Sequence, residues 1–172
     1  MTIIDISYLD KAKSTNEFSI NLIKKKISFK GIVVSDIQTS GRGRYGNKWI
    51  SNKGNIFCSV YKKVKNFEDI YDAQYNSLRM IVKYLKKKGI KKKKIKIKQP
   101  NDILIDNKKI CGILIESIKY KKNLYLIIGI GLNLITSPKI KNYSTTFLNR
   151  YVKNKIDKFD FVNFTKKNIK HF

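Results

Sequence analysis

Two of the four arginines of the chain, Arg42 and Arg44, lie two residues apart in the glycine-rich segment 38–46. Lysine outnumbers arginine by 34 to 4, so arginine at these positions requires a reason. A guanidinium group presents a planar fork of donors that matches a carboxylate or phosphate better than an ammonium does. Glycines let the backbone approach a ligand and offer it N–H donors. The segment therefore predicts an anion-binding loop, although a flexible surface loop explains its composition equally well.

A second polar segment, residues 98–102, separates two apolar stretches and reads KQPND. Asn and Asp after a proline are ordinary turn residues. Asn101 and Asp102 also suit a metal–phosphate group, because Mg²⁺ in proteins is commonly held by one or two carboxylates together with substrate phosphates. The spacing leaves both interpretations open.

Glycines also interrupt two apolar stretches further along the chain. Gly112 lies in segment 108–116, where a glycine inside a strand indicates a bulge or the close approach of a ligand. Segment 129–133 reads GIGLN and ends a strand-like run. It does not match a Rossmann dinucleotide fingerprint, because no further glycine and helix follow.

The elements that position these segments alternate between strand and helix patterns. Residues 14–17 form a capping-box pattern, and residues 68–88 carry apolar side chains at helical spacing between an acidic first turn and Gly89. The predicted helices are 14–26, 68–88, 145–151 and 159–169. The predicted strands are 2–7, 31–35, 55–61, 95–98, 103–105, 110–116 and 124–130.

The connections between the last four predicted strands are too short for crossovers, so these strands should pair antiparallel. The expected fold class is α+β, a mixed, mainly antiparallel sheet with helices on one side. With 172 residues, of which 42% are hydrophobic, the chain suffices for one well-packed domain over residues 1–172.

The net charge of +26 favours a polyanionic partner such as nucleic acid. However, an excess of lysine with 28 isoleucines and only two alanines is typical of an AT-rich coding bias, which predicts a general lysine coat. Cys58 and Cys111 lie in apolar runs without a metal-binding spacing, so we expect buried free thiols in a reducing compartment. The N-terminus does not resemble a signal peptide, and the apolar stretch 124–132 is too short to span a bilayer, so a cytoplasmic location without membrane contact is expected.

Taken together and in this order, the polar segments resemble the biotin–protein ligase family. The family pattern is an STN triplet, then QxxGRGR followed by WxS, then KWPND, KxxGILxE and GIGxN. The matching positions are 14–16, 38–44 with Trp49 and Ser51, 98–102, 109–116 and 129–133. The resemblance covers roughly residues 10–150, and it departs from the pattern at Gln99, where the family usually has tryptophan.

The resemblance implies a fold shared with lipoate ligases and class II aminoacyl-tRNA synthetases. It also implies ATP-dependent formation of biotinyl-5'-AMP and transfer of biotin to a lysine of a biotin carrier protein, such as that of acetyl-CoA carboxylase, with ATP and Mg²⁺ as cofactors. Because the chain ends soon after the last motif, we expect a catalytic domain alone, without an N-terminal helix-turn-helix or a C-terminal small β domain. A homodimer is compatible with the sequence.

The site residues follow from the matched motifs. Catalytic roles fall to Arg44 and Lys109. The implied biotin contacts are Ser14, Thr15, Gln38, Arg42, Lys109 and Gly112. The implied ATP contacts are Arg42, Arg44, Trp49, Asn101, Asp102, Gly131 and Asn133, and Asp102 would also hold the metal.

Two rival interpretations stay open. A lipoate–protein ligase would share the fold, although the Gly-Arg-Gly-Arg run argues against it. A non-enzymatic, basic nucleic-acid-binding protein would explain the charge. It would need aromatic residues interleaved with arginines on one face, whereas Arg42 and Arg44 lie among glycines.

Overall fold

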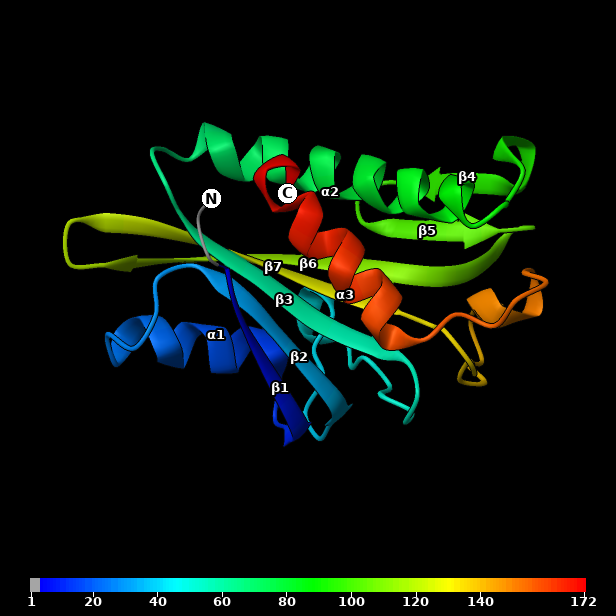
Figure 1. Cartoon of the computed structure of the whole chain (residues 1–172), viewed down its shortest axis with the longest axis horizontal. Helices are drawn as coiled ribbons and strands as arrows, with labels where there is room; N and C mark the ends of the chain where they lie inside the picture. Colours follow the sequence, from blue (N-terminus) through cyan, green and yellow to red (C-terminus); the bar gives the residue numbers. More distant parts are fainter. Residues whose placement is uncertain (1–3) are drawn as a thin grey trace.

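The computed structural model describes residues 4–172, in which seven strands form one sheet in the order β1-β2-β3-β7-β6-β5-β4 (Figure 1). The strands are β1 (Asp5–Ala12), β2 (Gly31–Gln38), β3 (Ile56–Val64), β4 (Ile95–Lys98), β5 (Asp102–Ile105), β6 (Lys108–Tyr120) and β7 (Asn123–Leu132). The α-helices are α1 (Thr15–Lys24), α2 (Glu68–Lys87) and α3 (Lys158–Lys167). Four short 3-10 turns are η1 (Arg44–Gly46), η2 (Lys92–Lys94), η3 (Leu148–Arg150) and η4 (Ile169–His171).

The pairing confirms a mixed, mainly antiparallel sheet. β1 and β2 are parallel and are joined through α1, whereas every other neighbouring pair is antiparallel. The predicted meander corresponds to β4 to β7, whose tight connections allow only antiparallel neighbours.

The helices cover both faces of the sheet, so the expectation that they lie on one side was wrong. In β2, Ile32 and Val34 join the core beneath α2 and α3, whereas Val33 points to the other face and packs in a smaller cluster with Ile23 of α1. Figure 1 shows α1 apart from α2 and α3, with the sheet between them. An uninterrupted apolar strand is compatible with burial on both faces, and in β2 both faces are buried.

The predicted helix at 145–151 is also wrong, because only η3 forms there. The N–H of Thr146 donates to the Lys109 carbonyl, and the N–H of Leu148 donates to the Asn133 carbonyl. These donors are therefore bound to the start of β6 and to the residue that follows β7, instead of to a helical turn. The segment runs as a strap across the ends of β6 and β7.

Two N-terminal predictions need adjustment. The predicted strand 2–7 is observed as β1, which extends to Ala12, and residues 2 and 3 lie outside the described part of the chain. Ser14 occupies the N-cap of α1 with extended backbone, but its side chain makes no capping hydrogen bond. The predicted capping box is therefore not formed.

Both cysteines are buried and free, as predicted. Burial raises the pKa of the Cys58 thiol to about 12, and it also raises the pKa of Cys111. At neutral pH both thiols are protonated, so neither serves as a nucleophile.

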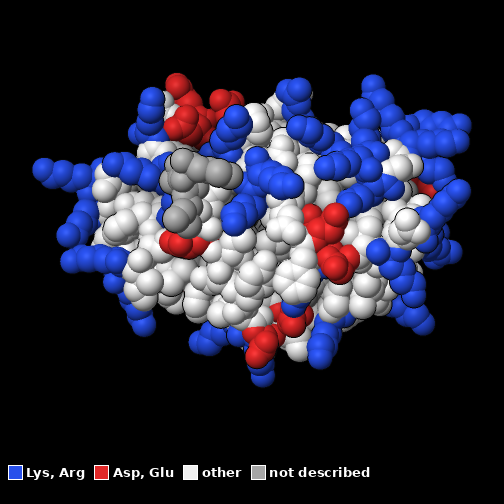
Figure 2. All heavy atoms as spheres, viewed as in Figure 1, with Lys and Arg blue, Asp and Glu red and all other residues white. Residues whose placement is uncertain are grey.

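Lysine and arginine side chains project all around the visible face of the molecule, with acidic groups in a few small clusters (Figure 2). This distribution fits the predicted general coat. Among residues 4–172, no helix combines the length and the apolarity needed to cross a membrane.

Candidate active site

A cavity of about 840 Å³ opens between the glycine-rich loop, the start of α1, the turn 98–102 and the segment 139–144, with β6 and β7 as its floor. This volume is in the range of small-molecule sites. Eleven of the twelve predicted site residues line it: Ser14, Thr15, Gln38, Arg42, Arg44, Trp49, Asn101, Asp102, Lys109, Gly112 and Gly131. The motifs, far apart in sequence, therefore surround one space.

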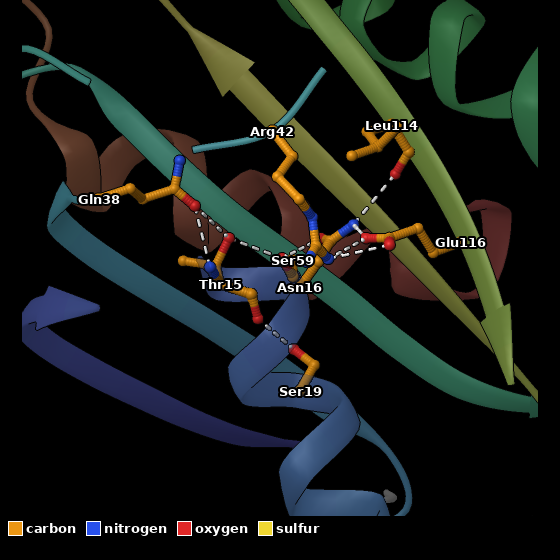
Figure 3. A network of polar contacts seen from close by, with 8 residues as sticks. All are labelled: Thr15, Asn16, Ser19, Gln38, Arg42, Ser59, Leu114 and Glu116. Atoms are coloured by element: carbon orange, nitrogen blue, oxygen red, sulfur yellow. Dashed lines mark hydrogen bonds and ion pairs between the residues drawn. The ribbon is translucent and has the colours of Figure 1, made fainter. Parts of the chain in front are cut away.

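One end of the cavity is lined by polar side chains that are hydrogen-bonded to one another, with Thr15 and Gln38 at their centre, and we call this group the polar bed (Figure 3). Gln38 Oε1 accepts a hydrogen bond from the backbone N–H of Thr15 at 2.9 Å and lies 3.2 Å from the Thr15 hydroxyl. Because a backbone N–H can only donate, this contact determines which amide atom of Gln38 faces α1. Its Nε2 then donates to the Ser51 hydroxyl at 3.2 Å. The Ser14 hydroxyl, free of a capping role, lines the same space.

Trp49 lies flat against the glycines of the floor. A Cβ added to Gly112 would meet Trp49 Cζ3 at 2.7 Å, and one added to Gly131 would meet Cε2 at 2.4 Å. The close approach predicted at Gly112 is thus real, but in this structure it is made by the indole ring. The accompanying bulge lies beside it, where Ile110 falls between the residues that pair with β5.

Lys109 is held far more tightly than the lysines of the surface coat. Its Nζ lies 2.8 Å from Asp102 Oδ1, and both side chains are less than one-fifth exposed. The ammonium also lies 5.4 Å from the centre of the Trp49 ring and 5.3 Å from that of Tyr143. Cation–π attraction and the ion pair together place this charge at the cavity wall. Its neighbour Lys108 is exposed.

The glycine-rich loop folds into a tight hairpin. The Gly43 N–H donates to the Asn47 carbonyl at 2.7 Å, and the Trp49 N–H donates to the Gly41 carbonyl at 2.9 Å. Arg44 stacks on its neighbour Tyr45, with 4.8 Å between the guanidinium carbon and the ring centre. Arg44 therefore stays at the cavity rim without an acidic partner among residues 4–172.

Arg42 lines the cavity, and its guanidinium extends to Glu116 of β6, which lies outside the lining. Its Nη2 donates to both Glu116 oxygens, at 2.9 and 3.0 Å. Of the three predicted cations, Arg42 and Lys109 thus already have acidic partners.

Asn101 connects the turn to the sheet through two hydrogen bonds with Ile113. Its side-chain Nδ2 donates to the Ile113 carbonyl at 3.2 Å, and its backbone carbonyl accepts from the Ile113 N–H. Asp102 Oδ1 is buried, and apart from the Lys109 ammonium no group among residues 4–172 approaches it as a hydrogen-bond donor. The 2.8 Å contact has the distance of an ion pair but lacks hydrogen-bond angles. The carboxylate consequently retains capacity for a cation.

Asn133 is the one predicted site residue outside the main cavity. It lines a small adjoining pocket together with Trp49, Lys109 and Tyr143. Its Nδ2 donates to the Thr146 carbonyl at 3.0 Å, and its buried Oδ1 has no hydrogen-bond partner among residues 4–172.

Four residues of this region were not predicted as site residues. Asn16 and Glu116 belong to the recognised motifs, so their motif membership was an available signal. Ser59 joins the polar bed from β3, where its hydroxyl lies 2.7 Å from that of Thr15. Tyr143 comes from a polar stretch after the last motif, and no pattern there indicated it.

The sheet order and the cavity on its face define the fold of class II aminoacyl-tRNA synthetases and biotin ligases. The model of the Biotin/lipoate A/B protein ligase family matches residues 8–133, and the chain belongs to this family.

Individual relatives agree with this assignment. The chain is 35% identical over 107 residues to biotin–protein ligase 2 of Arabidopsis thaliana, which covers 60% of this chain and 32% of that protein. It is 32% identical over 160 residues to the bifunctional ligase/repressor BirA of Bacillus subtilis, covering 88% and 48%. The biotin protein ligase from Aquifex aeolicus in complex with biotin and ATP matches with a TM-score of 0.74 at 26% identity, over 98% of this chain and 69% of that chain. The chain thus spans about a third to a half of these curated relatives.

Proposed function

We propose that this chain is the catalytic domain of a biotin–protein ligase. The biotin carboxylate attacks the α-phosphorus of ATP, which gives biotinyl-5'-AMP and pyrophosphate. A lysine amine of a biotin carrier protein then attacks the mixed anhydride, forms the amide and releases AMP. The observation that carries this proposal is the single cavity in which a polar bed at one end and the Lys109 cation at the other are separated by an apolar floor.

The polar bed suits the ureido ring of biotin. That ring offers N–H donors and a carbonyl acceptor, and Thr15, Gln38 and the free hydroxyl of Ser14 supply complementary groups. The apolar valeryl chain would then lie along the Trp49 ring, which covers Gly112 and Gly131. Lipoate carries a dithiolane ring without such groups, so the bed would bury unsatisfied polar atoms against it, and this favours biotin.

Lys109 and Arg44 are the cations assigned to the reacting oxygens. A carboxylate and a triphosphate repel each other unless positive charge lies between them. Lys109 is fixed at the wall, and Arg44 lies on the loop above it. Asp102 is the carboxylate that would hold Mg²⁺, together with the phosphates of ATP, and the bound ion would neutralise phosphate charge.

Asn133 is assigned to the adenine base. A carbonyl can only accept, so the hydrogen bond to Thr146 identifies which amide atom is Nδ2 and leaves the buried Oδ1 without a hydrogen-bond partner among residues 4–172. Oδ1 can accept from the exocyclic amine of adenine but would oppose the carbonyl of guanine. The half-exposed ring of Tyr143 beside this pocket offers a stacking surface.

Replacing Asn133 should therefore relax nucleotide selectivity. We expect Asn133→Ala to raise the KM for ATP about tenfold, as expected for one lost hydrogen bond in a buried site, and to narrow the preference for ATP over GTP. Pyrophosphate exchange with each nucleotide measures both quantities. An unchanged ATP preference would show that Asn133 only fastens the strap.

The loop should respond to the ligand. Residues 39–45 have little buried apolar surface, so we expect them to be cleaved readily by protease in the free protein and to be protected by biotinyl-5'-AMP. Limited proteolysis with and without the adenylate measures this, and equal cleavage rates would contradict it.

The proposed function itself is tested by biotin-dependent ATP–pyrophosphate exchange with the purified chain, with lipoate assayed in parallel. Exchange with biotin alone is the expected result. Exchange with lipoate alone would transfer the proposal to lipoate ligation, and exchange with neither would refute carboxylate activation by this chain.

A further inference from the structure

Arg42 lies in the glycine-rich loop, where its backbone pairs with that of Lys48 across the hairpin. It is flanked by Gly41 and Gly43, which have no side chain that could anchor the loop, and within residues 40–46 no other side chain forms an ion pair with the sheet. Ordering such a segment costs conformational entropy. Backbone hydrogen bonds from Thr39 and Ser40 to residues 12 and 13 offset part of this cost, and the Arg42–Glu116 pair adds a side-chain contact to β6.

Glu116 lies just outside the cavity. Gly112, Leu114 and Glu116 share one face of β6, because alternate residues of a strand point the same way. The first two line the cavity, whereas Glu116 does not. The guanidinium of Arg42 is therefore directed past the site toward its partner. Moving it onto a bound carboxylate or phosphate would leave Glu116 as an unpaired anion beside an anionic ligand.

Asn16 extends the contact into the polar bed, as Figure 3 shows. Its Nδ2 donates to Glu116 Oε2 at 2.7 Å, and its Oδ1 accepts from the Ser59 hydroxyl. The side chain is buried against Gly129, where a Cβ would lie 2.5 Å from Asn16 Oδ1. A continuous polar chain thus connects Gln38, Thr15, Ser59, Asn16, Glu116 and Arg42.

We propose that Arg42 acts as a positioning residue, whose salt bridge with Glu116, supported by Asn16, fastens the loop to β6 so that Arg44 and Trp49 are placed over the cavity. This inference rests on the proposed function only for the identity of the ligand. In this proposal the Arg42 side chain binds Glu116, whereas the family resemblance implies that it contacts biotin and ATP.

A charge exchange distinguishes the two roles. Arg42→Gln and Glu116→Gln each break the pair, and neither removes core volume because both side chains are partly exposed. The double variant Arg42→Glu/Glu116→Arg restores an ion pair with reversed polarity. Asn16 can follow by turning its amide, because the Ser59 hydroxyl accepts as well as donates, and this turn sacrifices only the long 3.4 Å hydrogen bond from Nδ2 to the Leu114 carbonyl. Asp106→Asn, which removes the exposed Lys94–Asp106 pair away from the loop, is the matched control.

We expect each single variant to increase proteolytic cleavage of residues 39–45 in the free protein several-fold. Each should raise the KM for biotin about tenfold and leave kcat within about threefold, because a fractionally populated binding-competent state weakens apparent affinity in proportion. The double variant should return both quantities to within about threefold of the parent. The control should match the parent throughout.

Loss of exchange activity in the double variant would overturn the proposal, because a cation that contacts substrate cannot be moved to position 116 without loss. Unchanged loop cleavage in the single variants would overturn it as well. The cleavage measurement needs no ligase activity, so failure of the proposed function and failure of this inference are separable.

Discussion

Lys109→Ala should slow biotin-dependent pyrophosphate exchange by about 100-fold or more. The Lys109 ammonium is preorganised by Asp102 and by the Trp49 and Tyr143 rings, and the proposed function assigns it to the negative charge that develops on the carboxylate and phosphoryl oxygens. A fixed charge in such a site stabilises a transition state by about 3–4 kcal/mol. The rate of exchange at saturating ATP and biotin measures the effect.

Two variants separate catalysis from stability. Lys108→Ala removes an exposed charge next in sequence and should be nearly silent. Lys109→Ala leaves Asp102 without its counter-ion, so thermal unfolding should occur at a lower temperature. Adding Asp102→Asn removes that anion and should recover stability without recovering exchange. Equal, small effects of the two lysine substitutions on exchange would return Lys109 to the general lysine coat.

Gly131→Ala should also reduce exchange, by about 100-fold. β7 lies between β3 and β6, where Gly131 pairs with Phe57 and Gly112, so its backbone is held on both sides. A methyl group 2.4 Å from Trp49 Cε2 must then displace the indole ring. A displacement of about 1 Å in a positioning group can cost two orders of magnitude in rate.

The role of the glycine is tested by combining substitutions. If Gly131 serves to accommodate the ring, Gly131→Ala should add little in a Trp49→Ala background, because both changes remove the same contact. Pyrophosphate exchange by the two single variants and the double variant gives the coupling. Full additivity would show that Gly131 accommodates the ligand directly.

Local patterns in the sequence determined much of this protein. Tight polar turns at residues 106–107 and 121–123 leave no room for a crossover, so the antiparallel meander follows from chain length alone. The helical spacing of residues 68–88 predicted α2 to within one residue at its end. The five polar motifs predicted which residues would meet, and eleven of the twelve line one cavity.

Tertiary contacts decided the features that a local pattern leaves undetermined. An uninterrupted apolar strand such as residues 31–35 is compatible with helices on one or both faces, and only the packing of Ile23 on Val33 shows that α1 takes the second face. Residues 145–151 form little helix because carbonyls distant in sequence, those of Lys109, Asn133 and Leu134, accept three of their N–H donors. The acidic partners of Lys109 and Arg42 lie 7 and 74 residues away. A charged side chain pairs with the opposite charge that lies nearest in space. The register of β6 with its neighbours therefore determines which charges remain free to bind a ligand.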